Sequence, residues 1–237
     1  MKERRKNTLR SILLMLAAII AACGTLYVSW RFANRRFYLT SVLLMIYFMV
    51  PFFFMFEHRK PKARELVVIA VMCAIAVVSR AVFIWAPNFK PLVAVVIITG
   101  IAFGPESGFL TGALAAFVSN FIFGQGAWTP WQMFAYGISG FLSGVLYQAG
   151  LLSKKKLPLC IFGGVVVVCI VGPILDTCAL CLLTTEINRE VADSIYLSGL
   201  PVNLVHASAV VLFLFFFSAP LFEKLDRIKE KYGMMEE

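Results

Sequence analysis

Four polar or ionisable side chains interrupt long apolar stretches of this sequence: Arg80, Asn120, Asp176 and His206. Each costs free energy in a membrane unless it has a partner or a function. Counting the helical rise from the ends of their stretches places all four in the outer half of a bilayer. Guanidinium, amide, carboxylate and imidazole groups at one depth could hold a polar solute. The structural alternative is an Arg80–Asp176 ion pair and a helix-packing role for His206.

Two segments between apolar stretches add aromatic and amide side chains. Residues 85–90 read Trp-Ala-Pro-Asn-Phe-Lys, and residues 123–132 read Phe-Gly-Gln-Gly-Ala-Trp-Thr-Pro-Trp-Gln. Flat rings stack on planar ligands, and amides supply hydrogen bonds. We therefore add to the candidate binding residues Trp85, Asn88, Gln125, Trp128, Trp131 and Tyr136. For the tryptophans, the alternative is an aromatic belt at the membrane interface.

The composition explains why these polar residues stand out. The chain has 237 residues, of which 60% are hydrophobic and 15% charged. Soluble domains average about 45–50% apolar and about 25% charged residues. This composition indicates one membrane domain and excludes a disordered chain, a disulfide scaffold and a cytosolic enzyme. The six cysteines lie in apolar runs, which predicts reduced, packed thiols.

The apolar runs predict an all-α polytopic membrane protein. A spanning helix needs about 20 apolar residues, and one run, 91–103, is shorter. Counting it as a span places most of the Lys and Arg residues on the inner side, as the positive-inside rule requires. Both termini are then cytoplasmic, and the net charge of +9 reflects topology rather than nucleic-acid binding. The predicted spans are 11–30, 38–56, 65–86, 91–103, 107–123, 131–149, 157–183 and 203–222.

The inner halves of the predicted spans carry small residues four positions apart, which let helices approach closely in lipid. These pairs are Ala70/Ala74, Gly108/Gly112 and Gly140/Gly144. The two interpretations are packing within the bundle and, for the Ala70/Ala74 pair alone, a face for another membrane protein.

Several functional classes fit this pattern poorly. A channel would carry polar residues at all depths, and a secondary transporter usually binds its substrate between repeated halves, which we do not find. An enzyme needs a dense cluster of catalytic groups, but the sequence has two His and few intramembrane acids. No GxxxxGK[ST] motif for ATP is present. We expect no catalytic residue, no resident cofactor and no metal.

Residues 62–148 contain KARELVVIAVMCAIAVVSRAVF, PNFKPLVAVVIITGIAFGPESG and FGQGAWTPWQMFAYG. This stretch resembles the substrate-binding S components of energy-coupling factor (ECF) vitamin transporters, and the similarity is looser through 157–222. The resemblance implies a six-helix membrane domain over 61–237. Residues 1–60 would be an extension that adds two transmembrane helices of open role.

The resemblance also implies a function and partners. S components are identified as bacterial cell-membrane subunits that bind a micronutrient on the outer side. They dock on a transmembrane coupling protein carrying two ATPases and topple to deliver the ligand. An Ala-x-x-x-Ala motif on the first family helix forms their docking face, and Ala70 and Ala74 match it.

The substrate implied by the resemblance is a vitamin. The segment FGQGAWTPWQMFAYG is most similar to cobalamin-type members, so cobalamin or a related corrinoid is the first expectation. Pantothenate and riboflavin are the alternatives. Two hypotheses from other classes remain: a membrane enzyme or accessory acting on a lipid or isoprenoid, and a structural subunit without a ligand.

Overall fold

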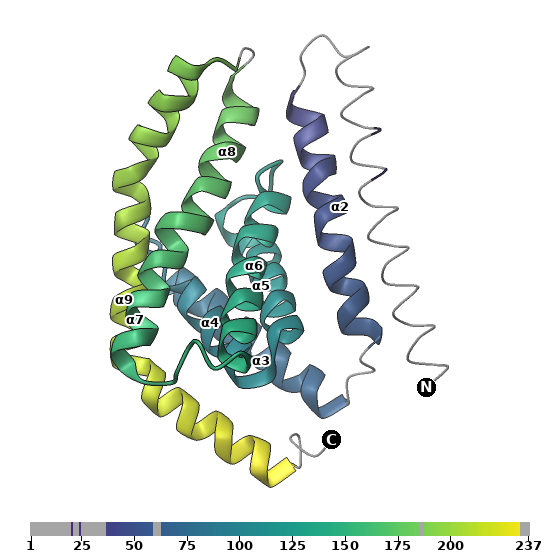
Figure 1. Cartoon of the computed structure of the whole chain (residues 1–237), viewed down its shortest axis with the longest axis vertical. Helices are drawn as coiled ribbons and strands as arrows, with labels where there is room; N and C mark the ends of the chain where they lie inside the picture. The colour runs from purple at the N-terminus through teal and green to yellow at the C-terminus, as the bar shows by residue number, and fades with distance from the viewer. Residues whose placement is uncertain (1–19, 21–23, 25–36, 59–62, 185–186, 233–237) are drawn as a thin grey trace.

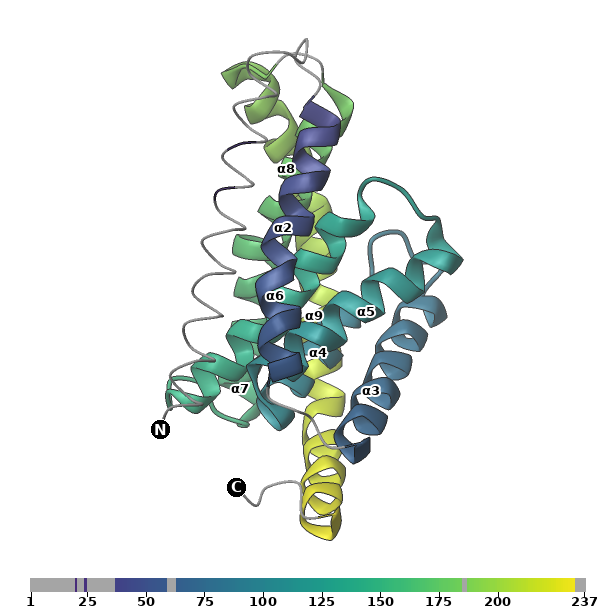
Figure 2. The same ribbon diagram turned by 90° about the vertical axis from the view of Figure 1, so that its right-hand side faces the viewer.

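The computed structural model describes residues 20, 24, 37–58, 63–184 and 187–232, and this part of the chain is all-helical (Figure 1). The first predicted span, 11–30, falls almost entirely outside these residues. The segments 83–91 and 124–128 lie close together above α3 at one side of the molecule, well below the upper tips of α8 and α9 (Figure 2). The helices are α2 Phe37–His58, α3 Ala63–Val82, α4 Leu92–Phe103, α5 Pro105–Phe123, α6 Thr129–Gln148, α7 Lys156–Val166, α8 Gly172–Leu183 and α9 Arg189–Tyr232.

Five helical segments are long and apolar enough to cross a membrane: α2, α3, α5, the continuous Lys156–Leu183 segment and α9. Helix α4, predicted as a span at 91–103, has 12 residues and a length of about 18 Å, against about 30 Å of hydrocarbon. Its residues from Leu92 to Ala102 are all buried. Helix α4 is therefore a central helix that neighbouring helices shield, which explains why it is apolar on every side.

Glycines bring α4, α5 and α6 into backbone contact. A Cβ added to Gly108 of α5 would lie 2.6 Å from Gly100 of α4 and 2.6 Å from Gly140 of α6. A Cβ on Gly112 would lie 2.5 Å from the Tyr136 carbonyl oxygen. Such distances leave no room for any side chain. Both predicted glycine pairs therefore act in packing within the bundle.

Helix α2 belongs to the predicted N-terminal extension, and it packs against α5, α6 and α8. Its Phe52 ring stacks on Phe109 of α5 with centroids 4.0 Å apart and meets Phe141 of α6 edge-on at 5.0 Å. Met49 is buried in the same cluster. In Figure 2, α2 lies along one side of the bundle, away from α3. Helix α2 thus covers one side of the bundle and does not cover α3, which lies on a different side.

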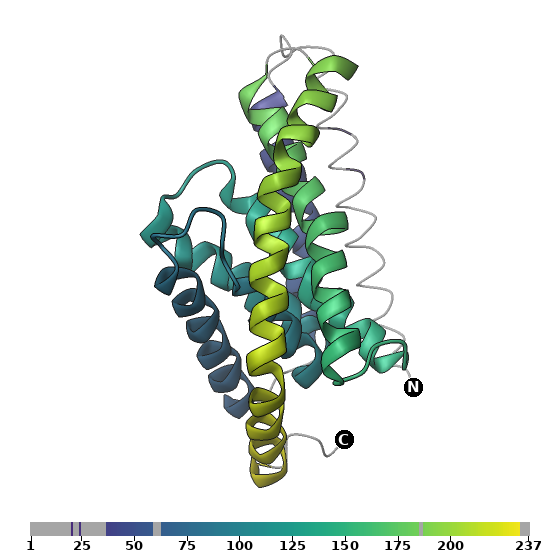
Figure 3. The same ribbon diagram turned by 90° about the vertical axis from the view of Figure 1, so that its left-hand side faces the viewer.

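Helices α7 and α8 form one continuous segment, joined by a π-helical turn at Val167–Val171. Pro173 follows this turn, and because proline lacks a backbone N–H it cannot continue the regular ladder. Helix α9 then runs for 44 residues beside them (Figure 3). The predicted span 203–222 lies inside this helix, and the segment between the predicted spans 157–183 and 203–222 is itself helical from Arg189. Helical spacing, and not loop geometry, therefore governs which residues meet at 189–202.

The C-terminal part of α9 contacts the end of the bundle that lies away from the Arg80 network. Lys154 of the α6–α7 connection forms an ion pair with Asp226 at 2.6 Å. Lys229 is buried with its ammonium 5.1 Å from the Phe103 ring centre, and Arg64 donates a hydrogen bond to the Tyr232 carbonyl at 3.3 Å. This end is closed by side chains from four segments.

Candidate ligand-binding site

Arg80 and Asn120 meet at the end of the bundle formed by segments 83–91 and 124–128. Arg80 lies near the C-terminal end of α3 and Asn120 near that of α5, and because these two helices run in the same direction the two residues lie at one level. The Arg80 guanidinium donates to the Asn120 Oδ1 atom at 2.9 Å and also to the Ser119 hydroxyl. Arg80 is 7% exposed and Asn120 1% exposed. Two predicted candidates are thus brought into direct contact.

The amide of Asn120 extends this contact into a network. Its nitrogen donates to the Thr129 hydroxyl at 3.0 Å and to the Gln132 side-chain oxygen at 2.9 Å, both on α6. Thr129 in turn donates to the Gln125 side-chain oxygen at 2.9 Å. Gln125 donates to the Phe117 carbonyl at 2.9 Å. Both N–H groups of the Asn120 amide are used by α6, which fixes the orientation of its oxygen towards Arg80.

No carboxylate pairs with Arg80 among the residues that the structure places. A second cation, Lys90, lies near it and donates to the carbonyls of Phe83 and Ala86. The Phe123 ring contacts both cations, 4.4 Å from the Arg80 guanidinium and 5.2 Å from the Lys90 ammonium. Burial and the charge of Arg80 lower the pKa of Lys90. The site therefore holds positive charge that the described protein groups leave uncompensated.

Tyr136 of α6 and His206 of α9 lie on the bundle-facing side of this network. Their rings meet edge-on with centroids 6.1 Å apart. Arg80 lies close enough to interact electrostatically with both. The buried Nε atom of Arg80 and the buried Nε2 atom of His206 have no hydrogen-bond partner in the placed part of the chain. Unused polar atoms of this kind can bind a ligand.

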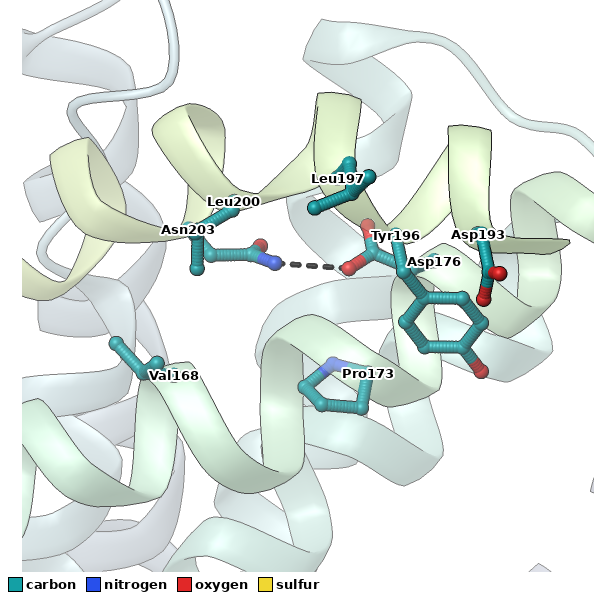
Figure 4. Close-up of a pocket in the computed structure, with 8 residues that line it drawn as sticks. All are labelled: Val168, Pro173, Asp176, Asp193, Tyr196, Leu197, Leu200 and Asn203. Atoms are coloured by element: carbon teal, nitrogen blue, oxygen red, sulfur yellow. Dashed lines mark hydrogen bonds between the residues drawn. The ribbon is translucent and has the colours of Figure 1, made fainter. Parts of the chain in front are cut away.

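Asp176 lies in a different place, a pocket between α8 and α9 with a volume of about 470 Å³ (Figure 4). Its Oδ2 atom accepts a hydrogen bond from the Asn203 amide at 2.8 Å. The predicted alternative of an Arg80–Asp176 ion pair was wrong, because the two side chains bond to different partners. The pocket is lined by Val168, Pro173, Asp176, Asp193, Tyr196, Leu197, Leu200 and Asn203.

Two glycines allow α8 and α9 to meet at the Asp176–Asn203 hydrogen bond. A Cβ on Gly172 of α8 would lie 2.5 Å from the Asn203 side chain, and a Cβ on Gly199 of α9 would lie 2.3 Å from the Asp176 carboxylate. Each helix thus presents a glycine to the polar side chain of the other. Asn203 and His206 are one helical turn apart on α9, so this contact lies beside the Arg80 network.

The predicted tryptophans do not converge on either location. Trp85 is 76% exposed, and Trp128 is 43% exposed with its indole N–H 3.3 Å from the Gly124 carbonyl. Trp131 is buried against Met45 of α2 and Cys178 of α8. Asn88 is exposed in a turn with φ of 60°. The three tryptophans and Asn88 therefore take surface or packing positions, whereas Arg80, Asn120 and Gln125 share one hydrogen-bond network.

Six further polar residues take part in the network or the pocket without being among the candidates, although the sequence pattern had placed Gln132 near Asn120 and Gln125. The α3–α4 connection and α5 contribute Lys90 and Ser119, α6 contributes Thr129 and Gln132, and α9 contributes Tyr196 and Asn203. Asn203 had a usable signal, because it lies one helical turn before His206. The others are common residue types whose role depends on which helices are neighbours.

The α3 face that carries Ala70 and Ala74, here called the docking face, points away from the bundle. Both alanines are exposed, and Val67, Val71 and Val78 on the same helix are 63%, 52% and 57% exposed. Met72 and Ala76 on the opposite side are buried. No described helix covers the docking face, so it lies free for lipid or for another membrane protein.

These features define a polytopic helical membrane protein with a buried polar network and an exposed apolar face on one helix. The family model described as "ECF-type riboflavin transporter, S component" matches residues 60–221. The match covers more than half of the chain, so the chain belongs to this family. ECF S components are substrate-capture subunits of vitamin transporters and not enzymes.

Curated relatives have a less informative description. A UPF0397 protein of Vibrio atlanticus (strain LGP32) is 28% identical over 135 residues, covering 54% of this chain and 74% of the relative. A UPF0397 protein of Aliivibrio fischeri (strain MJ11) is 29% identical over 119 residues, covering 44% of this chain and 64% of the relative. No solved structure matches the chain.

Proposed function

We propose that this chain captures a B vitamin at the outer surface of a bacterial cell membrane and delivers it through an ECF coupling protein with two ATPases. The observation that carries this proposal is the buried Arg80, which is held by Asn120 and Ser119 and has no carboxylate partner in the described chain. Burying a cation without an opposing charge is costly. A ligand group rich in hydrogen-bond acceptors would supply the missing interaction.

Riboflavin is the substrate we propose first. The family description names it, and the dione edge of its ring system presents acceptors for the Arg80 Nε atom, which has no partner among the described residues. The α8–α9 pocket of about 470 Å³ is within the range of about 300–1,000 Å³ found for small-ligand sites. Pantothenate carries a carboxylate and would supply an opposing charge, whereas riboflavin is neutral and would supply acceptors alone.

Cobalamin is the second candidate, and one observation favours it: the resemblance of the segment 123–137 to cobalamin-type S components. A corrin ring was expected to lie against broad aromatic surfaces. Trp131 instead packs on Met45 and Cys178, and Trp128 is hydrogen-bonded to Gly124 at the surface. A corrinoid would therefore require the 124–128 segment to move aside.

Delivery in this proposal uses the docking face of α3. The exposed Ala70 and Ala74 would let a helix of the coupling protein approach closely. The closed opposite end, with the Lys154–Asp226 ion pair and the buried Lys229, is consistent with toppling, which needs no continuous pore. Helix α2 lies on another side of the bundle and would leave this approach open.

A binding screen on the purified full-length chain in lipid nanodiscs tests the proposed function. Riboflavin is titrated by quenching of its fluorescence, and pantothenate and cobalamin by calorimetry. We expect submicromolar affinity for one vitamin, with riboflavin the tightest. Affinities weaker than micromolar for every B vitamin would contradict the proposal, and turnover of a lipid by the isolated chain would favour the enzyme alternative.

A further inference from the structure

Asp176 is a carboxylate inside a helical segment that is long and apolar enough to span a membrane, and no cation balances it in the placed residues. The ion pairs of the described chain join Lys154 to Asp226, Arg189 to Asp193 and Arg227 to Glu223. Asp176 has Asn203 as its hydrogen-bond partner and opens into the α8–α9 pocket. A charge kept at such a position is a functional feature by default.

The pocket offers more hydrogen-bond acceptors than donors. Two of its lining residues are carboxylates, Asp176 and Asp193, and none is Lys, Arg or His. One N–H of the Asn203 amide is used by Asp176, and the Tyr196 hydroxyl is 2.7 Å from the Thr177 hydroxyl. Figure 4 shows the Asp176 carboxylate between the Asn203 amide and the Tyr196 ring. The pocket is therefore suited to a ligand group that supplies donors.

The surroundings hold Asp176 in one position. Gly199 leaves space for one carboxylate oxygen, because a Cβ there would be 2.3 Å from the Asp176 Oδ1 atom. Asn203 binds the other oxygen, and Gly172 leaves space for Asn203 in turn. Asp193 differs, since it is exposed and lies 3.8 Å from Arg189 on its own helix. Asp176 is thus the preorganised carboxylate of the pair.

We propose that the α8–α9 pocket is a subsite that binds the hydrogen-bond donors of the captured vitamin through Asp176. This inference rests on the proposed function and assigns the acceptor and donor groups of the ligand to different parts of the site. The Arg80–Lys90 end receives acceptors, and the Asp176 end receives donors. Hydroxyl groups and ammonium groups share the required chemistry, so a hydroxylated side chain such as the ribityl chain of riboflavin fits, and so does a cationic vitamin.

The test compares Asp176→Asn with Asp193→Asn in the full-length chain in nanodiscs. The first substitution removes the charge but keeps the shape of the side chain and an oxygen for Asn203. The second is the matched control, because it removes a carboxylate from the same pocket. Riboflavin is the probe with hydroxyl donors, lumiflavin is the same ring system without the hydroxyl chain, and thiamine is the cationic probe. Thermal unfolding of each variant checks the fold.

We expect Asp176→Asn to weaken riboflavin binding about 10-fold or more, as for the loss of a hydrogen bond to a charged group. Lumiflavin affinity should not change, and Asp193→Asn should cost less than about 3-fold. Tighter wild-type binding of thiamine than of riboflavin, lost in Asp176→Asn, would support the subsite and identify the donor as a cation. If the wild type binds pantothenate or cobalamin instead, the same two variants are compared with that vitamin.

Two results would overturn the subsite while leaving the proposed function intact. One is unchanged vitamin affinity in Asp176→Asn. The other is an equal loss for riboflavin and lumiflavin or an equal loss in the two variants, which would indicate a general effect on the pocket. If the wild-type chain binds no vitamin, the proposed function itself fails and the subsite fails with it.

Discussion

The charge of Arg80 is unfavourable to the free energy of the folded protein for two reasons. It is buried, and no described carboxylate opposes it. The network around it does not neutralise the charge, because Ser119 and the Asn120 oxygen are neutral acceptors. Lys90 adds a second cation across the Phe123 ring. The two positive charges repel each other, so the arrangement is less stable without a ligand than with one. An acceptor-rich ligand would relieve this repulsion.

Replacing Arg80 with methionine separates a binding role from a structural one. Because the substitution removes a buried charge but keeps much of the volume, we expect the melting temperature to stay the same or to rise. Vitamin affinity should fall about 10-fold or more, the equivalent of about 1.5–3 kcal/mol for hydrogen bonds to a charged group. Binding and thermal unfolding are measured on the same preparation.

Arg189→Met is the control for this substitution, because Arg189 lies at the exposed start of α9. It should change neither affinity nor melting temperature. A large loss of stability in Arg80→Met with unchanged affinity would assign Arg80 to packing.

At the scale of elements, the site depends on helices that approach more closely than side chains normally allow. Gly100, Gly108 and Gly140 bring α4, α5 and α6 together, and this contact sets the distance between Asn120 on α5 and Thr129 on α6. Lipid provides no hydrophobic force between helices, so close van der Waals contact carries their association. The closely packed α4, α5 and α6 helices therefore support the Asn120 network.

Gly108→Ala tests this unit. The added methyl group would meet backbone atoms of Gly100 and Gly140 at 2.6 Å, and overpacking of this kind costs about 1–3 kcal/mol. We expect a lower melting temperature, measured by thermal unfolding in detergent, together with weaker vitamin binding.

Gly164→Ala in α7 provides the matched control. Its Cβ would lie 3.4 Å from Val211, an ordinary contact, and alanine favours a helix by about 1 kcal/mol over glycine. Its melting temperature should stay the same or rise. Equal destabilisation by the two substitutions would show that the close approach at Gly108 has no special role.

At the scale of the whole molecule, the proposed mechanism assigns binding and delivery to different surfaces. The polar network lies at the end formed by segments 83–91 and 124–128, whereas the docking face runs along the outside of α3 (Figure 2). The opposite end is closed by α9 through Asp226 and Lys229. This separation predicts that binding and uptake can be disrupted independently.

Replacing Ala70 and Ala74 together with leucine should abolish vitamin uptake and leave vitamin binding unchanged. The larger side chains would hold a partner helix away from α3, but they point out of the bundle and touch none of the binding residues. Uptake is measured in cells that produce the coupling protein and ATPases, and binding is measured on the purified chain.

Ala219→Leu, an exposed position on α9, serves as the control and should support normal uptake. Full uptake by the Ala70/Ala74 double variant would remove the docking face from the proposed mechanism. Loss of binding in that variant would show that the two surfaces are coupled.

The sequence by itself determined that the protein is an all-helical membrane protein, because apolar composition and span length depend only on residue type. It also identified Arg80, Asn120, Asp176 and His206 as exceptions, since a polar group in an apolar run is visible without a fold. The resemblance in 62–148 indicated the S-component family, which the family match at 60–221 confirmed.

Only the tertiary structure decided which of these exceptions act together. It joined Arg80 to Asn120, separated both from Asp176, and placed Trp131 under α2. It also showed that α4 is a short buried helix and that α9 begins at Arg189. The physical reason is that hydrogen bonds act over about 3 Å. Partners are therefore set by helix direction and close glycine contacts, which the order of residues along the chain does not specify.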